Sequence, residues 1–147
     1  MPDQHAEDSH TGASHAAFTL RNDPARIRAA EEGLIRAARA AGHDRSAAFA
    51  LRLALEEAVR NAFDHGRAGE PDATIDIAWT VEPERVLIHI DDHGPGFDPA
   101  AVADPTDEAN LERPCGRGLL LMRAYMSSVK FNEAGNAVTM RYEPTPG

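Results

Sequence analysis

Two segments in the middle of the chain carry an apolar side chain at every second position, and this pattern constrains the fold more than any other feature. The segments cover residues 74–79 and 86–90, and a short turn at residues 82–84 separates them. Their apolar residues are Ile75, Ile77, Trp79, Val86, Ile88 and Ile90. A period of two is typical of a strand with one buried face. The short connection predicts that the two strands pair as an antiparallel hairpin.

Two helices are expected before this hairpin. An Asn-Asp-Pro sequence, which combines a capping residue with proline in the first turn, predicts a helix over residues 24–41. Gly42 is expected to end this helix. Either Asp44 or Ser46 caps the next helix, which is expected to continue to His65.

The remaining elements are shorter. An edge strand is expected over residues 16–20, a polar loop over 98–115 and a third helix over 117–126. Two more strands, over residues 129–131 and 138–142, flank a Gly-Asn turn. Helices are thus segregated from antiparallel strands, which predicts an α+β two-layer sandwich, a mostly antiparallel mixed sheet covered by helices on one face.

Length and composition limit the classes of protein to which the chain can belong. A chain of 147 residues is long enough for one domain, and we expect a disordered tail at residues 1–15 and a domain over 16–147. The net charge of −9 argues against direct nucleic-acid binding. No apolar stretch is long enough for a membrane helix and no secretory signal is visible, so we expect a cytoplasmic protein. Cys115 is the single cysteine, and no internal disulfide can form.

The second helix carries an unusual polar flank. Its apolar residues Leu51, Leu55, Ala58 and Ala62 share one stripe and are expected to face the core. The opposite, solvent-facing row consists of Arg52, Glu56 and Arg60, in which Glu56 and Arg60 have the spacing of an ion pair.

Between these two rows lie Glu57, Asn61 and His65, at intervals of four residues. Such a row would line the edge of a cleft, where a carboxylate can act as a base and an amide oxygen can bind a hard cation. The spacing alone favours an ordinary polar flank over a site.

Two glycine-containing loops follow strands or precede helices. Asp92, Gly94 and Gly96 come directly after the second strand of the hairpin, and Gly116 and Gly118 precede the third helix. Glycines let a backbone approach a ligand closely, and a glycine loop at a helix N-terminus suits a phosphate. A tight surface turn and a simple helix boundary are the alternatives. The glycine spacing is not that of the dinucleotide-binding fingerprint, and a phosphate-loop lysine motif is missing.

Together these motifs resemble the GHKL ATPase superfamily, which includes gyrase-type topoisomerases, heat-shock chaperones, histidine kinases and mismatch-repair ATPases. The order E-x-x-x-N on a helix, D-x-G-x-G after a strand and G-x-G before a helix is the same, and the resemblance covers about residues 16–143. Within the superfamily, residues 56–62 and 116–122 look like those of the small stand-alone anti-sigma-factor serine/threonine kinases.

The resemblance implies a role for each motif residue. Glu57 corresponds to the general base, Asn61 to the Mg²⁺ ligand and Asp92 to the carboxylate that binds the adenine amino group of ATP. Gly94 and Gly96 let the backbone close around the base, and Gly116 and Gly118 surround the phosphates. Arg113 or Arg117 contacts the terminal phosphate. Asn136 stands where many members have threonine, and Pro114 and Cys115 stand where the lid usually has small polar residues.

Two functions agree with this resemblance. The first is a protein serine/threonine kinase that phosphorylates a small antagonist protein and sequesters a sigma factor. The second is a nucleotide-dependent binding switch without significant kinase activity. The resemblance also implies a homodimer, and neither alternative involves a membrane or direct contact with nucleic acid.

Overall fold

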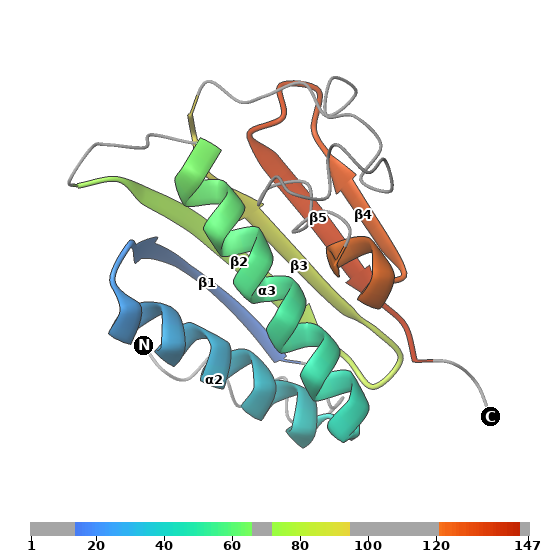
Figure 1. The fold of residues 1–147 in the computed structure, drawn as a ribbon. Helices are drawn as coiled ribbons and strands as arrows, with labels where there is room; N and C mark the ends of the chain where they lie inside the picture. Colours follow the sequence, from blue (N-terminus) through green and yellow to red (C-terminus); the bar gives the residue numbers. More distant parts are fainter. Residues whose placement is uncertain (1–13, 66–71, 95–120, 145–147) are drawn as a thin grey trace.

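The computed structural model describes residues 14–65, 72–94 and 121–144. Within these ranges, two long helices lie against one face of a five-stranded sheet (Figure 1). The helices are α2 (Pro24–Ala40) and α3 (Arg45–His65), and residues 121–125 are also helical. The strands are β1 (Ser14–Arg21), β2 (Thr74–Val81), β3 (Val86–Asp91), β4 (Ser128–Phe131) and β5 (Ala137–Tyr142).

The sheet has the strand order β1-β2-β3-β5-β4, and every neighbouring pair of strands is antiparallel. The expected hairpin is present, with Trp79 opposite Ile88. On the other side of β3, Ile88 lies opposite Met140 of β5. Because β5 pairs with both β3 and β4, the end of β3 lies next to the turn between β4 and β5.

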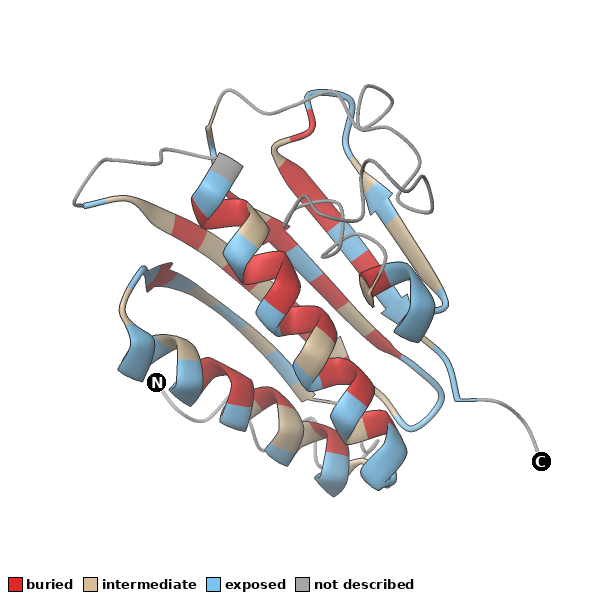
Figure 2. Ribbon diagram, viewed as in Figure 1, coloured by how far each residue is buried: buried red, intermediate tan, exposed pale blue. Residues whose placement is uncertain are grey.

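The core lies between the sheet and the two helices (Figure 2). In β2, buried and half-buried residues alternate along the whole strand, as its apolar pattern predicts. The largest fully buried side chains come from both layers: Leu34, Leu51, Leu55, Ile75, Ile77, Val81, Val86, Ile88, Ile90, Met122 and Met140. Full burial of one such side chain stabilises the folded state by about 1.5–3 kcal/mol, so this interface dominates the stability of the domain.

Local sequence signals fix both ends of α2. Asp23 is the N-cap, and its Oδ2 accepts a hydrogen bond from the amide of Arg26 at 3.3 Å, with Pro24 in the first turn. After the helix, Gly42 has φ = 100°, and its amide donates to the carbonyl of Arg39 at 3.0 Å. A left-handed glycine at this position closes the last turn of a helix.

The start of α3 settles a choice that the sequence left open. The Oδ1 atom of Asp44 accepts a hydrogen bond from the amide of Ala47 at 2.9 Å. Asp44 is therefore the capping residue, and Ser46 is not.

The predicted α+β sandwich is confirmed, with a difference at the start of the sheet. Strand β1 begins at Ser14, so the edge strand starts earlier than residue 16 and includes the end of the expected tail. Of the expected third helix, residues 121–125 are described and helical. The expected loop at residues 98–115 lies outside the described residues. Among the described helices, none is both long and apolar enough to cross a membrane.

Candidate functional site

A pocket opens where α3 passes the end of β3 and the start of β5. Its polar lining residues are Asn61 of α3, Asp92 after β3 and Asn136 before β5. The other lining side chains are mainly apolar and include Ile90, Met122, Phe131 and Val138. An apolar pocket with a few polar groups is typical of a small-molecule site. The fold thus brings the helix motif and the first glycine loop, which are distant in sequence, to one place.

Asp92 is held firmly at the edge of this pocket. It follows β3 directly and is 6% exposed. Its Oδ1 accepts a hydrogen bond from the amide of Gly94 at 2.6 Å, and its own amide donates to the carbonyl of Asn136 at 2.9 Å. The loop therefore turns around the carboxylate and remains attached to the neighbouring strand.

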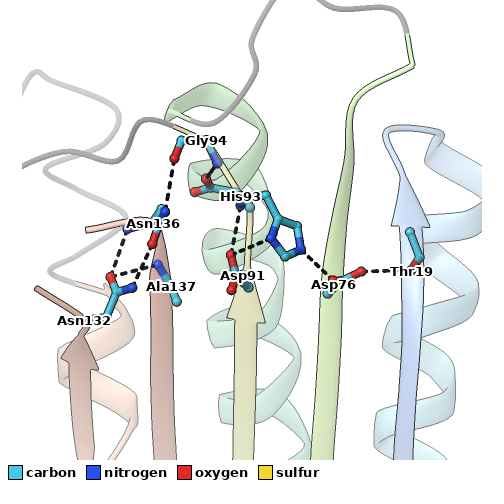
Figure 3. A network of polar contacts seen from close by, with 9 residues as sticks. Thr19, Asp76, Asp91, His93, Gly94, Asn132, Asn136 and Ala137 are labelled. Atoms are coloured by element: carbon cyan, nitrogen blue, oxygen red, sulfur yellow. Dashed lines mark hydrogen bonds and ion pairs between the residues drawn. The ribbon is translucent and has the colours of Figure 1, made fainter. Parts of the chain in front are cut away.

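Asn136 connects this loop to the turn between β4 and β5 (Figure 3). Its Nδ2 donates to the carbonyl of Gly94 at 3.1 Å. Asn132 fixes the turn from below, because its Oδ1 accepts hydrogen bonds from the amides of Asn136 and Ala137 at 3.0 and 3.1 Å. Asn136 thus supports the loop that carries Asp92.

Asn61 has an unsatisfied polar atom beside the pocket. Its Nδ2 is buried and has no hydrogen-bond partner among the described residues. A buried polar group without a partner costs about 1–3 kcal/mol, so a bound ligand that pairs with the amide would gain this energy. Because the oxygen and nitrogen of an amide are assigned from its contacts, a half-turn of the side chain presents the oxygen instead. Asn61 therefore fits a role as a ligand-binding residue.

Glu57 lies one helical turn before Asn61, and its side chain is 8% exposed. Arg60 holds both of its oxygens: Nη1 donates to Oε1 at 2.9 Å and to Oε2 at 3.0 Å. The expected pairing of Arg60 with Glu56 is therefore wrong. Glu56 is exposed, as its position on the solvent side predicts. Arg60 prefers Glu57 because three residues along a helix are as close as four, and the buried carboxylate needs a partner.

His93 forms a second polar network on the opposite side of the Asp92 loop (Figure 3). Its Nε2 lies 2.5 Å from Oδ2 of Asp76, and its Nδ1 lies 3.3 Å from Oδ1 of Asp91. The hydrogen bond with Asp76 raises the pKa of His93 more than partial burial lowers it. The same hydrogen bond, together with one from Thr19 at 2.8 Å, lowers the pKa of Asp76.

Several expected site residues lie outside the described residues. These are Gly96, Arg113, Gly116, Arg117 and Gly118. Helix α3 includes His65, but its side chain is not described. Within the described ranges, the structure brings Asn61 and Asp92 together at the pocket, with Gly94 bonded to Asp92. Glu57 lies one helical turn before Asn61 on α3 and is not itself a lining residue of the pocket.

Sequence reasoning missed three residues of this region. The sequence pattern pairs Arg60 with the wrong acid, and it gives no structural role to His93 or Asn136. A signal existed for Arg60, since its spacing allows either glutamate. No local signal identifies the partners of His93 and Asn136, because these contacts depend on strand pairing between distant segments.

Comparison with known proteins gives consistent results. The family of histidine kinase-like ATPase domains matches residues 20–142. The chain is 27% identical over 110 residues to the serine-protein kinase RsbW of Listeria monocytogenes. This match covers 69% of the present chain and 70% of the relative. It is 30% identical over 92 residues to an anti-sigma F factor of Anoxybacillus flavithermus, covering 60% and 62% of the two chains.

A solved structure shares the fold. The structure of the RsbU and RsbW domains of Rv1364c from Mycobacterium tuberculosis matches with a TM-score of 0.61 and 19% identity. The match covers 91% of this chain and 34% of the solved chain, so the present chain spans about a third of that protein.

The match over residues 20–142 includes both helices, the hairpin and the pocket, and it agrees with the motif order of the sequence. The chain therefore belongs to the family of histidine kinase-like ATPase domains.

Proposed function

We propose that the chain is an ATP-dependent serine/threonine protein kinase that phosphorylates a small antagonist protein and sequesters a sigma factor. The observation that carries this proposal is the pocket shared by Asn61 and Asp92, with the buried carboxylate of Glu57 one helical turn from Asn61. Relatives named serine-protein kinase and anti-sigma F factor support the same activity.

The pocket suits an adenine nucleotide. Its mainly apolar lining can pack against the faces of a purine ring. A carboxylate offers about four acceptor positions, so Asp92 can bind the adenine amino group in addition to the amide of Gly94. We assign adenine recognition to Asp92, with Gly94 and Gly96 allowing close approach of the backbone.

The proposed metal is Mg²⁺, with Asn61 as its protein ligand. Among the described residues, no group of three or more His, Cys, Asp or Glu side chains could hold a metal ion. Magnesium usually keeps several waters and takes its other ligands from one or two side chains and the phosphates of a substrate, so a single amide ligand fits this ion. When bound, Mg²⁺ neutralises charge on the phosphates.

Glu57 is the proposed general base. In the reaction, a serine or threonine hydroxyl of the antagonist protein gives its proton to Glu57 while its oxygen bonds to the γ-phosphorus of ATP. The bond from that phosphorus to the bridging oxygen breaks, and ADP leaves. Arg60, which holds both oxygens of Glu57, orients the carboxylate.

The glycines and arginines outside the described residues complete the proposal. Gly116 and Gly118 would surround the phosphates, and Arg113 or Arg117 would contact the terminal phosphate. These assignments rest on the resemblance of their motifs. A homodimer is part of the same proposal.

A side-by-side kinase assay of Glu57→Gln and Glu56→Gln tests the proposal. With labelled ATP and a small antagonist protein, Glu57→Gln should lower phosphoryl transfer by about 10²–10⁴-fold, the usual effect of losing a general base. Glu56→Gln should transfer phosphate at nearly the wild-type rate because Glu56 is exposed. Wild-type protein that binds ATP but transfers no phosphate to any antagonist would instead support the nucleotide-dependent switch.

A further inference from the structure

The loop that carries Asp92 is attached to the sheet on both sides. Toward β5, neutral hydrogen bonds join Asp92 and Gly94 to Asn136. Toward β2, the side chain of His93 reaches Asp76. Figure 3 shows the two attachments on either side of the end of β3. The attachment through His93 differs from the other because its charge depends on pH.

The backbone at His93 adopts an unusual conformation that makes this contact possible. Its φ is 59°, and no other non-glycine residue in the described part of the chain has a positive φ. The amide of His93 donates to Oδ1 of Asp91 at 2.9 Å, which fixes the peptide unit. Histidine, asparagine and aspartate adopt this left-handed region more often than other non-glycine residues. The turn at His93 directs its imidazole toward β2, while Asp92 is buried at the pocket.

Two carboxylates, those of Asp76 and Asp91, contact the His93 imidazole, and the charge of Asp92 also acts on it. Asp76 and Asp91 lie directly opposite each other in the pairing of β2 with β3, and Asp92 follows in the loop. Like charges in directly opposite positions of a sheet repel each other. Thr19 of β1 donates a hydrogen bond to the other oxygen of Asp76. One oxygen of this carboxylate therefore contacts β1 and the other contacts the loop. A protonated His93 offsets the repulsion, and a neutral His93 does not.

We propose that His93 is a positioning residue for nucleotide binding: its protonated side chain, held by Asp76 and Asp91, keeps the loop in the conformation that turns Asp92 into the pocket. The inference rests on the proposed adenine-binding role of Asp92. The raised pKa of His93 agrees with it, since the hydrogen bond to Asp76 favours the protonated ring most, and the charges of Asp91, Asp76 and Asp92 act in the same direction.

The sign of the effect follows from the charge of the ring. As pH rises through the pKa of His93, the imidazole loses its proton and the loop is held less tightly. If the nucleotide binds only when His93 holds the loop in place, the apparent affinity for nucleotide decreases in proportion to the fraction of molecules in that conformation. The side chains of His93 and Asp76 are about half exposed, at 50% and 49%. The contact therefore has the energy of an exposed ion pair, and ATP affinity should fall by about two- to five-fold when His93 loses its proton.

The experiment is a calorimetric titration of the full chain with ATP and Mg²⁺ from about pH 6 to about pH 8.5, the range in which histidine changes charge. The test variants are His93→Asn, which keeps a residue suited to positive φ, and Asp76→Asn. The matched control is His89→Asn. His89 lies on β3, the strand that precedes the loop, and its side chain bonds to Thr139 of β5 at 2.9 Å.

Wild-type protein and His89→Asn should lose affinity by about two- to five-fold across this range. His93→Asn and Asp76→Asn should each show a flatter profile, and the double variant should lose no more than either single variant. Titration of the nucleotide phosphates is common to all five proteins and cancels in the comparison. The imidazole resonance of His93 should titrate at a higher pH when the nucleotide is bound.

Two results would overturn the proposal in different ways. If the wild type binds ATP but His93→Asn keeps the wild-type pH profile, His93 has no positioning role and the proposed function remains. If the wild type binds no ATP at any pH, the proposed function fails, and the role of His93 fails with it.

Discussion

Replacing Arg60 with alanine should destabilise the domain more than the loss of an ordinary surface ion pair. Arg60 donates to both oxygens of Glu57, at 2.9 and 3.0 Å, and the Glu57 side chain is only 8% exposed. Without Arg60, this buried carboxylate loses two charge-assisted hydrogen bonds. A buried acceptor left without its partner costs about 1–3 kcal/mol.

The chain provides a matched control. Arg85 and Glu82 also form an ion pair three residues apart, at 3.3 Å, but their side chains are 46% and 30% exposed. Exposed pairs of this kind contribute about 0.2–1 kcal/mol. Arg85→Ala should therefore lower the free energy of unfolding by less than Arg60→Ala does.

Urea denaturation of both variants measures the difference. The dependence of the unfolding free energy on urea should stay unchanged, so that the shift in midpoint reports stability alone. In a double-mutant cycle, Glu57→Gln should remove most of the cost of Arg60→Ala. The reasoning is refuted if Arg60→Ala costs no more than Arg85→Ala, because the burial of Glu57 would then have no energetic consequence.

Two further predictions concern carboxylates. Burial and the nearby charge of Glu56 raise the pKa of Glu31, so its contribution to stability is present at low pH and is lost as pH rises through that pKa. Glu31→Gln should therefore be more stable than wild type by about 0.5–2 kcal/mol near pH 8, with a smaller gain at lower pH; urea titrations that show a less stable variant at the higher pH would contradict this. Asp92 should favour ATP over GTP by about 1–3 kcal/mol, because guanine places an oxygen where adenine has its amino group. Competition binding should show this preference weakened in Asp92→Asn, and equal wild-type affinities would count against the role.

The fold could be predicted because its signals are local. The alternating pattern of the hairpin requires a covered sheet, and the covering helices have clear ends at Asp23 and Gly42. Apolar stripes on α2 and α3 then identify the inner face of the helix layer. Strand pairing follows with little freedom, because short turns join β2 to β3 and β4 to β5.

The candidate site could be predicted only in part. The helical period separates buried Glu57 from exposed Glu56, and this holds in the structure. The spacing could not decide which of the two glutamates pairs with Arg60. That choice depends on how deeply each glutamate is buried when α3 packs against the sheet. The contact between His93 and Asp76 depends on the register of β2 with β3, which sequence patterns do not fix to a single residue. Asn136 supports the Asp92 loop for a similar reason, since β5 lies beside β3 only in the folded sheet.

The most direct test of the account is a calorimetric titration of ATP, with and without Mg²⁺, into the wild-type chain and Asn61→Ala. The account predicts Mg²⁺-dependent binding to the wild type at micromolar to millimolar affinity, about 4–8 kcal/mol, and loss of this Mg²⁺-dependent binding in a variant that remains folded. Absence of binding to the wild type would contradict the central claim that the pocket between α3, β3 and β5 is a nucleotide site. Unchanged Mg²⁺-dependent affinity in Asn61→Ala would show that Asn61 is only a polar residue on the flank of α3.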